Sequence, residues 1–235
     1  MSGIIVRIRK ELEGMGCAKI RASEQRFFKE PIKTHGVRSA EVVAIGRKYF
    51  REVKKLEKKE IFALCEELFS LGYNDAARIG CDWSYNLRAN YQPADFKIFE
   101  SWIDKYIDNW AKCDTFCNHT VGALVEMYPD YAEKLKILAR SKNRWLRRAA
   151  AVSLIVPVKR GKFLPEVFAI ADILLEDEDD MVQKGYGWLL KVAGEKHQEE
   201  VFAYVMRRKT RMPRTALRYA IEKMPSDLKK LAMKK

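Results

Sequence analysis

The sequence predicts an all-α protein built from stacked helical hairpins, and three observations support this prediction. Apolar residues recur at the three- and four-residue spacing of amphipathic helices along most of the chain. No segment shows the sustained alternation of apolar and polar residues that is typical of strands. Three stretches in the C-terminal half also resemble one another at the period of one helical pair.

The expected helices are short and closely connected. Pro93 and Pro129 each suit the first turn of a helix. Backbone N–H groups there have no partner within the helix, so a proline, which lacks this group, costs no hydrogen bond. Gly72 and Gly194 follow helical runs, at the position of a C-terminal cap. Helical spacing is clearest in four groups of apolar residues: Ile61, Leu64, Cys65 and Leu68; Phe96, Phe99, Ile103 and Tyr106; Phe168, Ala171 and Leu175; Leu217, Ala220 and Ile221.

The internal repeat aligns "NRWLRRAAAVSLI" from Asn143 with "DDMVQKGYGWLLKV" from Asp179 and "TRMPRTALRYAIEK" from Thr210, at offsets of 36 and 31 residues. In each copy a basic residue precedes small residues, which allow close helix packing, and larger apolar residues follow. Gly185 and Gly187 each cost about 1 kcal/mol inside a helix. We therefore expect a neighbouring helix or a ligand to approach the backbone there, and close packing is the simpler explanation.

This period predicts a HEAT-like solenoid, organised as a single repeat domain over residues 1–235. The inner helices of a solenoid line a concave face. If Arg148, Lys184 and Arg214 occupy equivalent places in the copies, they make that face a basic groove. The acidic run "EDEDD" at residues 176–180 opposes this trend, and we interpret it as a helix start rather than a metal site, because carboxylates favour the positive end of the helix dipole.

The composition favours a polyanionic partner. The chain carries 45 Lys and Arg against 32 Asp and Glu, a formal charge of +13, which suits nucleic acid but is also found in ribosome-associated and membrane-surface proteins. Five cysteines without a repeated CxxC indicate reduced thiols, so we expect a cytoplasmic protein. No apolar run is long enough for a membrane span, and we expect a soluble chain.

Residues 110–119, "WAKCDTFCNH", combine several chemically active side chains. Cys113, Cys117 and His119 offer at most three metal ligands in poor helical geometry, so we expect no metal and interpret the cysteines as packing residues. Trp110 and Asp114 are four apart and share one helix face. Two interpretations of this pair stay open, a functional indole and carboxylate, or a core tryptophan with a surface carboxylate near the neighbouring lysine.

Several motifs together resemble one known family. They are "PIKTHGVRSAEVVAIGRKYF", "IDNWAKCDTFCNHTVG", "SKNRWLRRAAAVSLI", "DDMVQKGYGWLLKVAGEKHQEEVFAYV" and "PRTALRYAIEKMP". With them the chain resembles the DNA alkylation repair family, whose best-understood members are the AlkD-type alkylpurine DNA glycosylases. The resemblance implies a HEAT-like solenoid that wraps duplex DNA containing alkylated bases and releases cationic N3- or N7-alkylated purines without a metal or other cofactor.

The resemblance also assigns roles to individual residues. It implies that Asp114, Trp110 and Trp188 are catalytic and that Arg148 contacts DNA. We expect three further basic residues, Arg147, Lys184 and Arg214, to bind DNA as well. The chain departs from the family in the Ala-Lys-Cys between Trp110 and Asp114, and in having Phe27 or Phe28 where some members have tyrosine.

Three functions follow as hypotheses. The first is a monomeric, monofunctional DNA glycosylase in which Asp114 stabilises the developing positive charge on the sugar and holds water, while Trp110 and Trp188 face the cation. The second is a non-catalytic protein of the same superfamily that recognises bent or branched DNA. The third is a HEAT scaffold for another protein.

Overall fold

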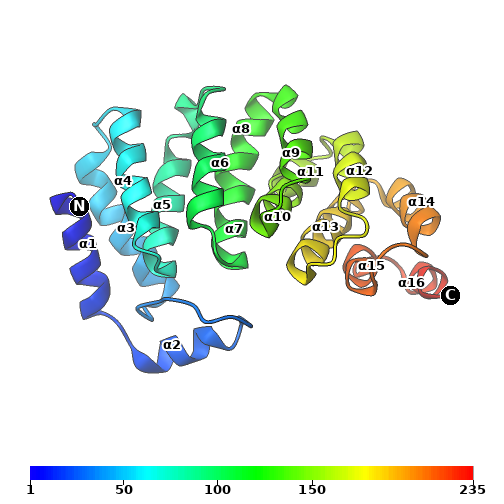
Figure 1. The fold of residues 1–235 in the computed structure, drawn as a ribbon, viewed down its shortest axis with the longest axis horizontal. Coiled ribbons are helices and arrows are strands. Elements are labelled where there is room, and N and C mark those ends of the chain that lie inside the picture. Colours follow the sequence, from blue (N-terminus) through cyan, green and yellow to red (C-terminus); the bar gives the residue numbers. More distant parts are fainter. Residues whose placement is uncertain (235) are drawn as a thin grey trace. The chain divides into compact units, whose positions relative to one another are not determined.

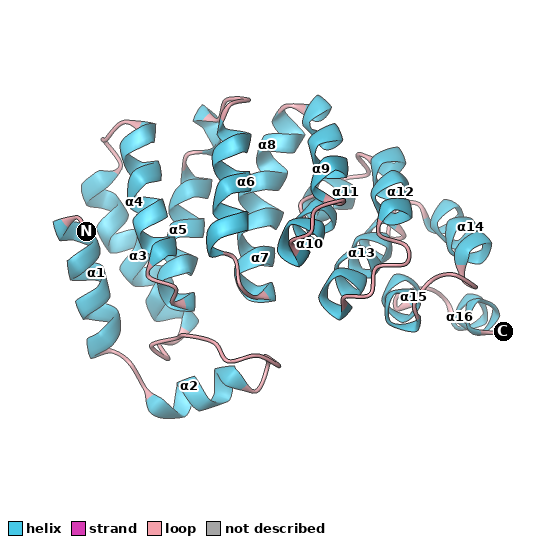
Figure 2. Ribbon diagram, viewed as in Figure 1, coloured by secondary structure: helices cyan, strands magenta, loops and turns pink. Residues whose placement is uncertain are grey.

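The computed structural model describes residues 1–234, and helices are the only regular secondary structure within that range (Figures 1 and 2). The all-α prediction is confirmed. The chain divides into two compact units, Met1–Phe116 and Cys117–Lys235. No helix in the described range is long and apolar enough to cross a bilayer. The single repeat domain, the solenoid and the basic groove stay predictions.

The first unit has a core rich in aromatic side chains. Its helix α5 packs against α1, α3, α4 and α7, and Trp83, Trp102 and Phe116 are among its fully buried side chains. Its elements are α1 (Gly3–Gly14), α2 (Ala18–Gln25), α3 (Ser39–Val53), α4 (Lys58–Ser70), α5 (Asn74–Asn86), the 3-10 turn η1 (Arg88–Asn90), α6 (Asp95–Tyr106) and α7 (Trp110–Phe116).

Helices α3 and α5 pack against each other at Gly46 of α3. A β-carbon at Gly46 would lie 3.4 Å from Ile79 of α5. The indole of Trp83, also on α5, donates a hydrogen bond of 2.9 Å to the carbonyl oxygen of Gly46. A buried indole N–H without an acceptor would cost 1–3 kcal/mol, roughly, so this contact fixes α5 against α3.

Helix α2 differs from the other α-helices of the unit because none of its residues is buried. Most helices gain their stability from packing an apolar face, which α2 does not have. Polar contacts hold it and the following loop instead. Arg21 donates to the carbonyl oxygen of His35 at 3.0 Å, and the side chain of Gln25 bonds the backbone at Phe28, Glu30 and Ile32.

The second unit is arranged around α13, which packs against both α10 and α15. Each of the three stretches of the predicted repeat falls largely on one of these helices, so the repeated segments are neighbours in the fold. The elements of the unit are the π-helical turn η2 (Cys117–Val121), α8 (Gly122–Met127), the 3-10 turn η3 (Pro129–Tyr131), α9 (Ala132–Leu138), α10 (Arg144–Val152), α11 (Ile155–Lys159), α12 (Leu164–Ile173), α13 (Asp180–Ala193), α14 (Gln198–Arg208), α15 (Arg214–Ile221) and α16 (Ser226–Met233).

Two glycines explain how α13 fits between its neighbours. A β-carbon at Gly187 would lie 2.7 Å from Cβ of Tyr219 and 2.8 Å from the carbonyl oxygen of Ala216, both on α15. At Gly185 it would meet the side chain of Arg148 on α10 at 3.3 Å. The prediction that a neighbouring helix approaches these glycines is confirmed.

The acidic run before α13 begins that helix, as predicted. The Asp179 carboxylate accepts hydrogen bonds from the backbone N–H groups of Met181 at 2.8 Å and Val182 at 3.2 Å. A side-chain acceptor at this position satisfies amides that have no partner within the helix. Asp180, in the first turn, forms an ion pair with Lys184.

The predicted positions of glycine and proline at the helix ends are correct in part. Gly72 has a φ of 78° after the end of α4, a conformation that favours glycine. Gly194 caps α13 with a φ of −63°, so that position does not require glycine. Pro93 precedes the start of α6 rather than lying in its first turn, and Pro129 opens a 3-10 turn instead of an α-helix.

We predict that Gly187→Ala lowers the free energy of unfolding by about 1–3 kcal/mol, because the added methyl group overpacks rigid backbone on α15. Urea denaturation followed by circular dichroism measures the change. The control is Gly14→Ala at the end of α1, where a β-carbon meets no atom within 4 Å. An equally stable Gly187→Ala protein would contradict the close packing of α13 and α15.

Candidate functional site

Helix α7 presents the two residues singled out in the sequence, Trp110 and Asp114. The helix begins at Trp110, and the buried side chain of Asn109 accepts a hydrogen bond from the backbone N–H of Lys112 at 3.1 Å. The same side chain donates to Asn74 on α5 at 2.9 Å. Trp110 and Asp114 are one turn apart and both are only partly buried, so this face of α7 is accessible.

The structural alternative for this pair is a core tryptophan with a surface carboxylate near Lys112 or at a local cap. The neighbouring lysine, Lys112, is buried and forms an ion pair with Asp108 at 2.9 Å, and it also donates to the carbonyl oxygen of Gly72 at 2.9 Å. Trp110 is outside the group of buried core residues, so the core-tryptophan part of the alternative is wrong.

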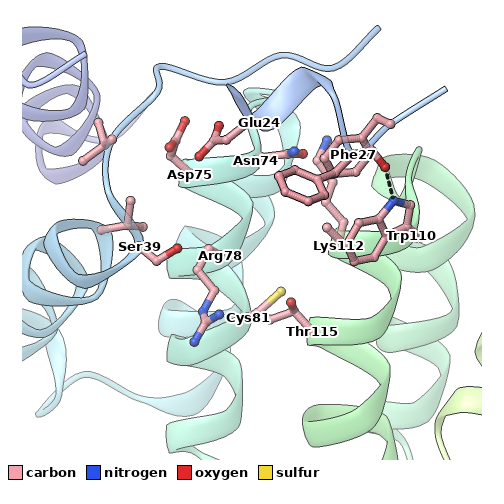
Figure 3. A pocket seen from close by; sticks show the side chains of 14 residues that line it. Glu24, Phe27, Ser39, Asn74, Asp75, Arg78, Cys81, Trp110, Lys112 and Thr115 are labelled. Carbon is pink, nitrogen blue, oxygen red and sulfur yellow. Dashed lines mark hydrogen bonds between the residues drawn. The ribbon is translucent and has the colours of Figure 1, made fainter. Parts of the chain in front are cut away.

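Trp110 is held by the segment that follows α2. Its ring stacks on Phe28, with centroids 5.0 Å apart and planes 18° apart. Its Nε1 donates a long hydrogen bond of 3.4 Å to the carbonyl oxygen of Phe27, drawn as a dashed line in Figure 3. The side chain of Phe27 is 72% exposed. Of the two candidate aromatics, Phe28 is therefore the one that packs on Trp110.

A pocket of about 210 Å³ opens beside Trp110 within the first unit (Figure 3). Trp110 and Thr115 of α7 lie on one side of it, and Glu24 and Asp75 lie on another. The lining residues are Glu24, Phe27, Phe28, Val37, Ser39, Val42, Asn74, Asp75, Arg78, Cys81, Trp110, Ala111, Lys112 and Thr115.

A network of hydrogen bonds at Asp75 anchors the loop between α2 and α3. The buried Asp75 carboxylate accepts from the backbone N–H of His35 at 2.6 Å and from the Thr34 hydroxyl at 3.0 Å. That hydroxyl is also 2.6 Å from the Glu24 carboxylate. Burial raises the pKa of Glu24, and the nearby charge of Asp75 adds to the rise.

The other predicted catalytic residue, Trp188, lies on α13 in the second unit and is partly exposed. Trp110 and Asp114 both belong to the first unit. The roles of these three residues stay predictions.

The four basic residues predicted to bind DNA have different surroundings in the second unit. Arg148 is 5% exposed and donates to the carbonyl oxygen of Met181. Lys184 pairs with Asp180 at 2.8 Å. Arg214 is exposed at the start of α15.

Arg147 takes part in an ion pair that is largely buried. Its guanidinium donates to both carboxylate oxygens of Asp177, at 2.6 and 3.3 Å, and to the carbonyl oxygens of Ser141 and Lys142. The side chain of Asp177 is only 9% exposed. Arg147 therefore joins the loop before α10 to the loop before α13.

Cys113 and Cys117 are packing residues, as predicted. Cys113 and Cys117 have no exposed surface, and burial raises the pKa values of the Cys65 and Cys81 thiols, which disfavours a nucleophilic thiolate. Within residues 1–234 no group of three or more His, Cys, Asp or Glu side chains is placed to hold a metal ion.

Sequence reasoning missed the acidic side of the pocket. Glu24 and Asp75 are far apart in the chain and belong to no repeated pattern. The one local signal was Gly36 in "THGV", whose φ of 75° and lack of a side chain let residues 34–37 turn against α2.

Comparisons with known proteins identify the family of this all-helical chain, which has an accessible indole and carboxylate on one helix. The chain belongs to the DNA alkylation repair enzyme family, whose model matches residues 8–224. A solved structure described as a predicted DNA alkylation repair enzyme from Enterococcus faecalis superposes with a TM-score of 0.81, covering 90% of this chain and 98% of that one, at 14% sequence identity. Comparison with curated proteins gives no match.

We predict that Arg147→Ala lowers the free energy of unfolding by roughly 1–3 kcal/mol, because it leaves the Asp177 carboxylate buried without its partner. Chemical denaturation is the measurement, and Arg214→Ala, which removes an exposed guanidinium, is the matched control with little expected change. If both variants lose the same stability, the Arg147–Asp177 pair has no special structural role.

Proposed function

We propose that the protein is a DNA glycosylase that releases cationic N3- and N7-alkylated purines from duplex DNA by hydrolysis of the N-glycosidic bond. The observation that carries the proposal is the accessible pair Trp110 and Asp114, one turn apart on α7. Membership of the DNA alkylation repair enzyme family and the formal charge of +13 support a DNA substrate.

The chemistry of the leaving group explains why few catalytic groups are needed. A purine alkylated at N3 or N7 already carries a positive charge, so it can depart without protonation by a general acid. As the bond to C1′ breaks, positive charge develops on the deoxyribose. A carboxylate fixed beside the sugar stabilises that charge more in the transition state than in the ground state.

Asp114 is the residue proposed to supply this carboxylate. From α7 it would face the sugar and accept a hydrogen bond from the attacking water, which adds to C1′ as the base leaves. Trp110 would offer the face of its indole to the cationic sugar or base, a contact of on the order of 1–2 kcal/mol when water is excluded. Its stacking on Phe28 restricts the ring before DNA binds.

Trp188 is proposed as the second aromatic wall. Its partly exposed ring on α13 has the same capacity for a cation–π contact. This role requires that the second unit brings α13 to the same lesion as α7.

The basic residues of the second unit are proposed to bind the phosphates. Arg214 and Lys184 are the accessible members, and contacts of this kind add affinity without reading sequence. Arg147 and Arg148 are already ordered by Asp177 and Met181, so a phosphate contact there would cost little side-chain entropy. We propose that the protein acts as a monomer in the cytoplasm and requires no metal or organic cofactor.

The test is release of free base from a duplex containing N7-methylguanine, measured under single-turnover conditions. We predict that the wild-type protein releases the base and that Asp114→Asn slows release by about 100-fold or more, because a neutral amide does not stabilise the developing cation. The matched control is Asp130→Asn, an exposed carboxylate outside α7, with an unchanged rate.

Two results would contradict the proposal in different ways. Equal rates for wild type and Asp114→Asn would remove the role of Asp114. Tight binding to bent or branched duplexes with no release from any alkylated substrate would instead support a non-catalytic DNA-binding protein of this family.

A further inference from the structure

Arginine side chains gather at a second pocket of the first unit, the α3–α5 pocket, which has a volume of about 440 Å³. Arg47 and Arg51 of α3 line it together with Arg78 of α5. Asp82 of α5 is the one acidic residue among the described side chains of the lining. Three guanidinium groups against one carboxylate leave two positive charges, so the pocket has the charge of an anion-binding site.

The two arginines of α3 are not neutralised. Arg47 and Arg51 are one turn apart and both are exposed. Neither has an ion pair or a side-chain hydrogen bond within residues 1–234, and the nearby Glu52 pairs with Arg7 at 2.6 Å instead. Like charges at this spacing repel and weaken a helix. An anion bound between the two guanidinium groups would therefore stabilise α3.

Arg78 has hydrogen-bond donors left for a ligand. Its Nε donates to both carboxylate oxygens of Asp82, at 3.1 and 3.2 Å, and within the part of the chain that the structure describes its two terminal nitrogens have no acceptor. The side chains of this pair are 47% and 36% exposed, and exposed ion pairs are weak. In Figure 3 the guanidinium points away from Asp75. A ligand in the α3–α5 pocket can therefore bind Arg78 without breaking a strong contact.

The lining below the arginines is apolar. Gly46 and Phe50 of α3 and Trp83 of α5 contribute to it, and the rings of Phe50 and Trp83 have centroids 5.8 Å apart. The indole N–H of Trp83 is already bonded to the carbonyl oxygen of Gly46. Walls of low dielectric strengthen the attraction between charges of opposite sign. The volume is within the range of small-molecule sites, so the group that carries the anion can also enter.

We propose that the α3–α5 pocket binds the phosphate group of a nucleotide, held by Arg47, Arg51 and Arg78. Guanidinium groups suit this ligand because their planar fork donates two parallel hydrogen bonds to phosphate oxygens. The phosphate belongs either to a DNA strand or to a free nucleotide, two sources with the same chemistry. The DNA source rests on the proposed function, since Arg78 also lines the pocket beside Trp110.

The first arm of the experiment measures affinity for a short unmodified duplex by fluorescence anisotropy at several salt concentrations. If the phosphate is that of DNA, Arg47→Ala combined with Arg51→Ala should weaken binding about tenfold or more and reduce the salt dependence, the slope of log K against log salt, by about one or two. Lys97→Ala combined with Lys105→Ala, two exposed residues of α6 outside both pockets, removes the same charge and should weaken binding less than about threefold.

The second arm uses a free nucleotide and its matched nucleoside. Isothermal titration calorimetry measures the binding of deoxyadenosine monophosphate and of deoxyadenosine, which has the same base and sugar without the phosphate. Saturable binding of the monophosphate alone, lost in the double arginine variant while duplex affinity matches that of the lysine control, assigns the pocket to a free nucleotide. Loss of duplex affinity without saturable binding of the monophosphate assigns it to a DNA strand.

A third variant tests the pocket by a gain of binding. Asp82→Asn removes the carboxylate that competes for Arg78 and repels a phosphate, so it should strengthen binding of the ligand identified above by about threefold or more. Asp130→Asn, an exposed residue of the second unit, should leave the affinity unchanged. The thermal unfolding midpoint of each variant shows that the fold is retained.

The proposed pocket is overturned if the double arginine variant binds both the duplex and the monophosphate as the lysine control does. Release of N7-methylguanine from alkylated duplex, measured on the same samples, separates this inference from the proposed function. Release by a protein whose pocket variants bind both ligands normally would overturn the pocket and leave the glycosylase intact. Weaker phosphate binding in the double arginine variant, without base release by the wild type, would support the pocket and contradict the glycosylase.

Discussion

The first unit depends on the hydrogen bonds that the Asp75 carboxylate accepts from Thr34 and His35. Helix α2 buries none of its own residues, so apolar packing does not hold it in place. The anchored loop holds α2 in place instead. The segment after α2 then places Phe28 on Trp110. Because the carboxylate is buried, replacing it would leave a buried backbone N–H without its acceptor, a larger loss than that of a surface contact. The orientation of the candidate catalytic indole thus depends on a residue outside its own helix.

The packing of the second unit depends on a different feature, two glycines of α13 that have no side chains. Gly185 and Gly187 let α13 approach α10 and α15 at distances that a β-carbon would prevent at Gly187. The same approach buries Arg148 against α13, and the ion pair of Arg147 with Asp177 joins the loops that precede α10 and α13. Basic residues that the sequence suggests as DNA contacts therefore also stabilise the fold. Loss of DNA binding in such variants has to be separated from loss of stability.

Much of the fold could be predicted from local patterns. Apolar spacing predicted the helices, the EDEDD run predicted the start of α13, and the aligned stretches predicted neighbouring helices, because each depends on residues close in sequence. The i, i+4 spacing also predicted that Trp110 and Asp114 share one helix face, and the structure shows that both are only partly buried. The stacking of Phe28 on Trp110 and the approach of Glu24 and Asp75 to the same Thr34 hydroxyl could not be predicted this way, because they bring together residues about 50 to 80 positions apart without periodicity.

The proposed activity requires that the lesion lie beside α7. The most direct measurement is a crystal structure of the protein bound to a duplex with a single N7-methylguanine nucleotide, stabilised against hydrolysis by a 2′-fluorine on its sugar. We predict that the Asp114 carboxylate lies about 3.5 Å from C1′ of that nucleotide, with the Trp110 ring against the same sugar. A duplex bound on a face that leaves Asp114 and Trp110 in solvent would contradict the account.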